Sequence, residues 1–237
     1  MTILICEMVG TAMLILLGDG VVANVLLNKS NMKGAGPVQI TIAWGLAVLI
    51  PAYIFGASSG AHFNPALSIA LMIDGTISFG QLFLYIIGQM VGAFIGAVLV
   101  FIMFYEQFKA TDDPLVKRAC FCTSPAVPNR KLNLLSEIIG TFVLVFAIKG
   151  IGNVAGAGEQ GLNYFFVFAI IVSVGMSLGG LTGYAINPAR DLGPRIAHYL
   201  LPIPGKGDSG FDYAIVPVVG PIIGAVAAIV LFKIIPW

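Results

Sequence analysis

Six apolar stretches, each long enough to cross a lipid bilayer, constrain the fold of this chain more than any other feature of its sequence. They lie at about residues 3–27, 38–56, 80–104, 133–152, 162–180 and 213–236. A helix needs about 20 apolar residues to cross the hydrocarbon core. Because lipid offers no hydrogen bonds to the backbone, a run of this length must satisfy its own N–H and C=O groups, as a helix does. The sequence therefore predicts an all-α membrane protein with six transmembrane helices.

The composition excludes several classes of protein. The chain is 58% hydrophobic and 10% charged, whereas soluble domains are about 45–50% apolar and about 25% charged. A formal net charge of +1 gives no reason to expect nucleic acid as a partner. The first apolar run has no basic segment before it and is longer than a signal peptide, so we expect it to be retained as a span.

Two further apolar segments are too short to cross the bilayer. They run from Asn64 to Ile73 and from Asn187 to His198. At about 1.5 Å per residue they reach about 15–18 Å, roughly half of a core about 30 Å thick. Each begins with Asn followed by Pro, which are a preferred N-cap residue and the preferred first residue of a helix. We expect two re-entrant half-helices.

The two halves of the chain match each other in sequence. The matched segments are Glu7–Thr11 with Glu137–Thr141, Ser59–Ala66 with Thr182–Ala189, and Gly88–Ala93 with Gly220–Ala225. Each half holds three crossings, and an odd number inverts the second half relative to the first, as in many transport proteins. We expect one channel domain over residues 1–237, with a first repeat of about 1–105, a connecting loop of about 106–132 and a second repeat of about 133–237.

The inverted halves carry two Asn-Pro-Ala boxes whose starts should meet near the membrane midplane. These boxes are Asn64-Pro65-Ala66 and Asn187-Pro188-Ala189. A helix N-terminus carries about half a positive charge. Two such ends in a pore would repel protons and metal cations but not neutral solutes. The capping carboxamides of Asn64 and Asn187 would offer N–H groups to the oxygen of a passing water or hydroxyl.

The paired boxes, together with Glu7 and Glu137 in the first helix of each half, resemble the aquaporin superfamily over essentially the whole chain. Arg190 and Asp191, directly after the second box, are similar to the glycerol-facilitator (aquaglyceroporin) branch. The resemblance implies a passive channel for glycerol, water and other small uncharged solutes, not an enzyme, without a cofactor. It also implies a homotetramer with one pore per subunit, in the cell membrane, with both chain ends in the cytoplasm.

The family's selectivity filter maps by resemblance onto Trp44, Gly175, Tyr184 and Arg190. Arg190 has five donors in a planar fork, which suits two adjacent hydroxyls. Trp44 and Tyr184 would face the C–H side of a polyol, and Gly175 would leave space for Tyr184. Many glycerol facilitators have Phe where this chain has Tyr184, so its hydroxyl bears on the ranking of glycerol, water and urea.

Other polar residues are expected to support the pore. Glu7 and Glu137 should accept hydrogen bonds from backbone N–H groups of the re-entrant loops, because a carboxylate facing lipid is costly. His62 should lie beside the pore. Asp191 could pair with Lys or Arg or cap its own half-helix, and the resemblance suggests that it widens the pore without touching solute. Asp19 has two open placements, in the vestibule or at the centre of an oligomer.

Several alternatives stay open or are disfavoured. A water-selective channel, or one for urea or small neutral acids, is the alternative within the family. An ion-coupled secondary transporter also uses inverted repeats but usually has paired ionisable residues at the midplane. The metalloprotease motif HExxH is absent from the sequence. With histidine only at positions 62 and 198, and cysteine only at 6, 120 and 122, no metal site is expected.

The distribution of basic residues conflicts with the orientation that the resemblance implies. The side assigned as extracellular carries Lys29, Lys33, Lys109, Lys117, Arg118, Arg130, Lys131 and Lys206. The side assigned as cytoplasmic keeps Lys149 and Lys233, although cytoplasmic loops are usually the more basic ones.

Overall fold

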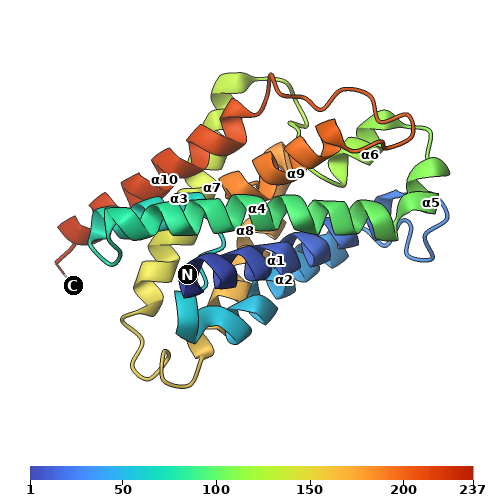
Figure 1. Cartoon of the computed structure of the whole chain (residues 1–237). Coiled ribbons are helices and arrows are strands. Elements are labelled where there is room, and N and C mark those ends of the chain that lie inside the picture. Colours follow the sequence, from blue (N-terminus) through green and yellow to red (C-terminus); the bar gives the residue numbers. More distant parts are fainter. Residues whose placement is uncertain (237) are drawn as a thin grey trace.

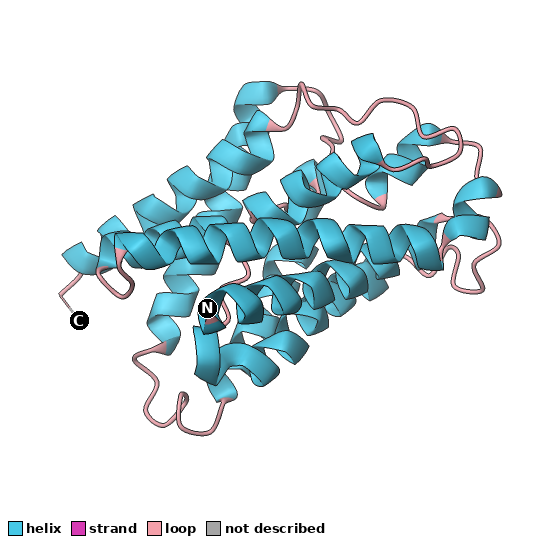
Figure 2. Cartoon of the chain, viewed as in Figure 1, coloured by secondary structure: helices cyan, strands magenta, loops and turns pink. Residues whose placement is uncertain are grey.

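A computed structural model describes residues 1–236, and all regular secondary structure in that range is helical (Figure 2). Six helices are long and apolar enough to cross a membrane. They are α1 (Thr2–Leu26), α2 (Pro37–Ser59), α4 (Phe79–Met103), α7 (Arg130–Ile151), α8 (Leu162–Thr182) and α10 (Ile215–Ile234). Their bounds lie within three residues of the expected spans, so the prediction of six transmembrane helices is confirmed.

The two half-helices are α3 (Pro65–Asp74) and α9 (Pro188–Leu200). The side chain of Asn64 caps α3 by accepting a hydrogen bond from the N–H of Ala66. The side chain of Asn187 caps α9 by accepting from the N–H groups of Ala189 and Arg190. Each helix has proline at its start, so the Asn-Pro pair defines where each begins.

The segment between the repeats is more ordered than the predicted loop of about 106–132. It contains two short helices, α5 (Tyr105–Lys109) and α6 (Pro114–Ala119). Asp113 caps α6 and Pro114 follows it, which is a helix-start signal that was present in the sequence. The segment packs against the interior of the bundle, since the side chains of Phe108, Cys120 and Phe121 are fully buried. Cys6, Cys120 and Cys122 are all free thiols.

The arrangement of the helices repeats between the two halves of the chain (Figure 1). In the first half α1 packs against α2 and α4, and in the second half α7 packs against α8 and α10. The half-helices cross over, since α3 packs against α10 and α9 packs against α4. Both termini lie at one end of the bundle, and α5 and α6 lie at the other (Figure 1). The crossover brings the starts of α3 and α9 together in the interior.

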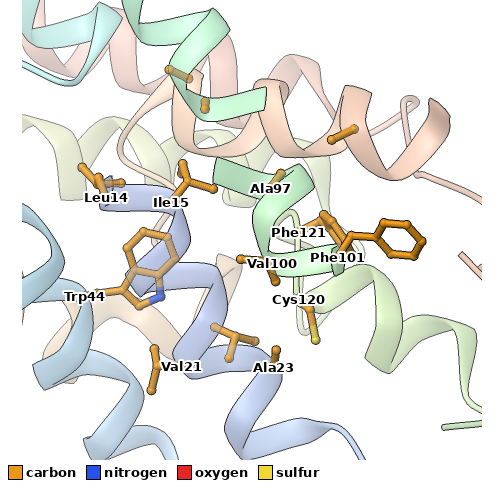
Figure 3. Packing of buried hydrophobic residues seen from close by; sticks show 14 of the residues in the cluster. Leu14, Ile15, Val21, Ala23, Trp44, Ala97, Val100, Phe101, Cys120 and Phe121 are labelled. Atoms are coloured by element: carbon orange, nitrogen blue, oxygen red, sulfur yellow. The ribbon is translucent and has the colours of Figure 1, made fainter. Parts of the chain in front are cut away.

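Small residues allow α1 and α4 to pack at close range. A Cβ atom at Gly92 of α4 would lie 2.2 Å from the carbonyl oxygen of Met8 on α1. The equivalent position in the second half, Gly224 of α10, has the same 2.2 Å approach to the carbonyl oxygen of Ile138 on α7. Further along the first interface, Ile15 and Ala97 are fully buried (Figure 3). Close backbone contact of this kind drives helix association in lipid.

We expect Gly92→Ala to destabilise the protein by about 1–3 kcal/mol, because the added methyl group forces α1 and α4 apart. The measurement is the thermal unfolding temperature in detergent. Gly20→Ala is the matched control, since a Cβ atom there meets nothing within 4 Å, and alanine has the higher helix propensity. A Gly92→Ala protein that unfolds at or above the parent's temperature would contradict this packing.

The outer surface of the bundle is apolar, as a lipid-facing surface requires. On α4 the exposed side chains include Phe83, Ile87, Val91 and Ile95. Their spacing of four residues puts them on one face of the helix. An exposed apolar face of this length suits hydrocarbon and not water.

Candidate functional site

A cavity of about 480 Å³ lies in the interior and is lined by residues from both halves of the chain. Its wall is mainly apolar, with a few polar side chains at separated points. The polar and aromatic side chains of the wall include Trp44, His62, Asn64, Thr76, Asn163, Tyr164, Tyr184, Asn187 and Arg190. At one end the lining includes Gly152, Val154 and Gly158 of the α7–α8 connection. A passage of this kind suits a small solute that is partly polar and partly apolar.

Asn64 and Asn187 are held in fixed orientations where the half-helices meet. Nδ2 of Asn64 donates to the carbonyl oxygen of Ile186 at 2.8 Å, and Nδ2 of Asn187 donates to that of Phe63 at 2.8 Å. Each half therefore anchors the cap of the other. These bonds use one N–H of each amide, and an amide NH2 group has two. Because both residues line the cavity, the second N–H of each is free to meet a solute oxygen.

The backbone leading into each half-helix is strained in the same way. Ala61 and Phe63 have φ of 52° and 48°, and the matched Tyr184 and Ile186 have 38° and 44°. Non-glycine residues in this left-handed region cost of order 1–3 kcal/mol each and persist only where their surroundings hold them. In this conformation, backbone N–H groups of both loops point toward buried side chains that accept their hydrogen bonds.

Glu7 and Glu137 supply those partners. The Glu7 carboxylate accepts from the N–H groups of His62 at 3.1 Å and Phe63 at 2.8 Å. The Glu137 carboxylate accepts from those of Ala185 at 3.0 Å and Ile186 at 2.8 Å. Both glutamates are almost fully buried, at 0% and 1% exposure. A buried carboxylate thus satisfies the donors of each strained loop, as the sequence led us to expect.

Hydroxyl groups complete both carboxylate sites. Ser59 donates to Glu7 at 2.7 Å, and Thr182 donates to Glu137 at 2.7 Å. Gln89 adds a further donor to Glu7 at 2.8 Å. Sequence reasoning did not assign these three residues. The repeat alignment held the signal for two of them, because it pairs Ser59 with Thr182 and both carry a hydroxyl.

Three of the four residues expected in the selectivity filter, Trp44, Tyr184 and Arg190, line the same cavity. The guanidinium carbon of Arg190 lies 4.0 Å from the centre of the Trp44 ring, which is a cation–π contact. Tyr184 lines the same cavity, and its hydroxyl lies 3.5 Å from Oγ1 of Thr41. Gly175 is buried behind Tyr184, where a Cβ atom would lie 2.9 Å from the tyrosine Cζ. It makes room for the ring without lining the cavity.

The comparisons with known proteins agree with this geometry. The family described as Major intrinsic protein matches residues 1–232. The chain belongs to the major intrinsic protein family. A probable glycerol uptake facilitator protein of Thermotoga maritima is 50% identical over 233 residues, 98% of this chain and 99% of that protein. The glycerol uptake facilitator protein of Bacillus subtilis is 52% identical over 218 residues, 92% of this chain and 79% of that protein. The X-ray structure of the aquaglyceroporin from Plasmodium falciparum has a TM-score of 0.84 at 27% identity, covering 98% of this chain and 95% of that one.

Family membership confirms the resemblance inferred from the two boxes. This major intrinsic protein is an integral, multi-pass membrane protein of a channel family and not an enzyme. Among residues 1–236, no group of three or more His, Cys, Asp or Glu side chains could hold a metal ion.

The remaining expected site residues lie close to the cavity in this family member. His62 lines it, stacks on Tyr85 at 4.1 Å between ring centres, and places Nδ1 3.0 Å from Oγ of Ser68. Pro65, Ala66, Pro188 and Ala189 are buried in the first turns of the half-helices and shape them without lining the cavity.

Asp191 lies behind the cavity wall and organises the loop that packs on it. Its carboxylate accepts from the N–H and the hydroxyl of Thr123, both at 2.7 Å. It also pairs with Arg195, one turn further along α9, at 2.7 Å. Of the two roles considered for Asp191, the structure therefore shows pairing with arginine. Thr123 had no signal in the sequence, whereas Arg195 had one, because it stands four residues after Asp191 on the expected half-helix.

Asp19 occupies neither of the two places considered for it. Its Oδ1 lies 3.2 Å from Nη1 of Arg190, and its side chain has 0% exposure. Nη1 of Arg190 also approaches the carbonyl oxygen of Phe121 at 3.5 Å. Sequence reasoning could not find this pair, because 171 positions separate its two members.

Proposed function

We propose that this chain is a passive channel for glycerol and other small uncharged solutes, and also for water, that excludes protons and ions. The observation that carries the proposal is that Arg190, Trp44 and Tyr184 line one cavity, with the guanidinium of Arg190 over the Trp44 ring. We take these three residues as the constriction of the pore. Glycerol has hydroxyls along one edge and C–H groups along the other. The constriction offers hydrogen-bond donors to the first edge and an apolar surface to the second.

The interior supplies further donors and a barrier to cations. Within residues 1–236, the side-chain hydrogen bonds of Arg190 all come from Nη1, which leaves Nε and Nη2 for a solute. Asn64 and Asn187 each keep one N–H for a passing oxygen. The positive ends of α3 and α9 meet at these asparagines and oppose protons and metal cations. The names of the relatives, glycerol uptake facilitators, support glycerol as the solute.

The same proposal includes the setting of the channel. We place it in the cell membrane as a homotetramer with one pore per subunit and both termini in the cytoplasm. Its single domain consists of two repeats, about 1–105 and about 133–237, joined by the connecting segment. Several basic residues on the outer side have structural partners, which weakens the conflict with the usual charge distribution. Lys117 donates to the carbonyl of Pro204 at 2.5 Å, and Lys206 donates to that of Leu201 at 2.7 Å.

Three other functions would give different results in transport assays. A water-selective channel would pass water but not glycerol, and a channel for urea or small neutral acids would rank those solutes first. An ion-coupled transporter would accumulate its solute against a gradient. A passive channel only equilibrates it, whatever ion gradient is imposed.

The test is stopped-flow light scattering on vesicles that contain the purified protein. We expect glycerol to enter these vesicles several-fold faster than empty ones, with urea and water measured in parallel to rank the solutes. Glycerol entry no faster than into empty vesicles would overturn the assignment. Accumulation above the external concentration would overturn passive transport.

A further inference from the structure

Asp19 is a buried carboxylate that contacts the constriction without lining the cavity. It lies on α1, and its one ion-pair partner among residues 1–236 is Arg190 on α9. Its second oxygen, Oδ2, is buried and has no hydrogen-bond partner there. The other buried carboxylate in this region, Asp191, is occupied by Arg195 and Thr123. Arg190 is therefore the one cation that the Asp19 carboxylate pairs with among residues 1–236.

The same short segment of α1 also positions the aromatic wall. A Cβ atom at Gly18, the residue before Asp19, would lie 2.2 Å from the Trp44 ring, so the indole rests directly on the backbone of α1. Figure 3 shows Trp44 beside that helix. Arg190 covers the ring of Trp44 with its guanidinium carbon 4.0 Å from the ring centre. Gly18 thus contacts the Trp44 ring, and Asp19 holds the Arg190 guanidinium that covers that ring.

Stability alone gives a weak reason for an aspartate at this position. Replacing a buried ion pair with apolar residues of similar volume is often neutral or stabilising. An oxygen without a partner in a buried site adds to the cost of the charge. A role in the pore accounts for the residue better than a role in folding.

The charges around the pore indicate what that role is. The ends of α3 and α9 that meet at the asparagines are both positive, and Arg190 adds a full positive charge. This field repels cations, but by itself it would attract anions into the pore. Asp19 places a negative charge 3.2 Å from the guanidinium, which balances the charge of the constriction while leaving its outward N–H groups in place.

We propose that Asp19 is a positioning residue that holds Arg190 against Trp44 and neutralises it, so that the constriction excludes anions as well as cations. The proposal rests on the proposed function, since it assumes that the cavity is the conducting path. Asp19 acts through Arg190 and does not touch the solute. Neutral solutes then meet a donor-rich but electrically balanced constriction.

Asp19→Asn separates charge from shape, because it keeps an acceptor of nearly the same size and removes the negative charge. We expect chloride permeability of vesicles, driven by a membrane potential, to rise several-fold over that of the parent. The matched control is Asp212→Asn, which removes an equal charge from an exposed aspartate that pairs with Arg130 at 3.6 Å; we expect no rise. Unchanged chloride permeability in folded Asp19→Asn would overturn the charge-balancing role.

Asp19→Glu tests whether Asp19 holds Arg190 in place against Trp44. It also tests the proposal if Asp19→Asn does not fold. The charge is retained but the longer side chain displaces the guanidinium, so we expect chloride exclusion like that of the parent with an altered glycerol-to-water ratio. In a Trp237→Phe background Trp44 is the only tryptophan, and its emission maximum should shift in Asp19→Glu. Chloride leak in Asp19→Glu, or unchanged Trp44 emission with an unchanged flux ratio, would overturn the proposal. Emission and chloride flux do not require glycerol conduction, so a parent that fails to pass glycerol refutes the proposed function separately.

Discussion

Arg190→Ala is expected to raise ion leak and to lower discrimination between solutes, even where total flux increases. The change removes the guanidinium that covers Trp44 and leaves Asp19 without its partner. It also widens the constriction and removes the donors that select for adjacent hydroxyls. The measurements are proton and potassium leak, together with the relative rates for glycerol, urea and water, in vesicles containing equal amounts of folded protein.

Tyr184→Phe is the matched control, because it alters the same constriction without altering its charge. It removes the hydroxyl that lies 3.5 Å from Thr41 and keeps the aromatic surface. The glycerol-to-water ratio should change while proton exclusion stays intact, since Arg190 and the half-helix ends are untouched. If Arg190→Ala folds well and leaves both the leak and the solute ranking unchanged, the constriction lies elsewhere in the cavity.

Glu7→Leu and Glu137→Leu are expected to reduce the yield of folded channel sharply. Each change strands two buried backbone N–H groups, those of His62 and Phe63 in the first half or of Ala185 and Ile186 in the second. A stranded buried donor costs about 1–3 kcal/mol, and the strained loop loses the group that holds it. The measurement is the fraction of monodisperse protein after extraction, together with its unfolding temperature.

Glu7→Gln and Glu137→Gln are the corresponding controls. Glutamine keeps an acceptor oxygen but loses the strength of a charged acceptor, so we expect a modest loss of stability and retained transport. A leucine variant that is as stable and as active as the parent would remove the carboxylate from its role in supporting the loop.

Most of the fold could be predicted from the sequence, because the bilayer leaves few alternatives. Apolar length alone located the six spans, since an unpaired backbone cannot cross lipid. The half-helices were predictable because Asn64 and Asn187 are N-caps followed by proline. The helices α5 and α6 were not predicted, although Asp113 and Pro114 marked the start of the second. Their fold depends on burying side chains such as Phe108 and Phe121, which local sequence does not specify.

In the candidate site, too, residues in sequence motifs could be predicted, and contacts between residues far apart in the sequence could not. The pore-facing asparagines and the supporting glutamates lie in motifs that repeat between the halves, and Arg190 directly follows the second of the two boxes. Asp19, the partner of Arg190, has no counterpart in the second half, and the pair forms only when α1 and α9 come together in the folded bundle. Thr123 beside Asp191 was likewise hidden, because its contacts form only when the connecting segment folds onto α9. Arg195 was not hidden, since its spacing of four residues from Asp191 puts both on one face of the half-helix.

Glycerol flux and proton flux, measured in the same vesicles, test most directly whether this chain is a passive channel for neutral solutes. The paired asparagines and the constriction predict rapid glycerol entry while an imposed proton gradient decays no faster than in empty vesicles. Glycerol entry at the rate of empty vesicles, or a proton gradient that collapses as glycerol enters, would contradict that function.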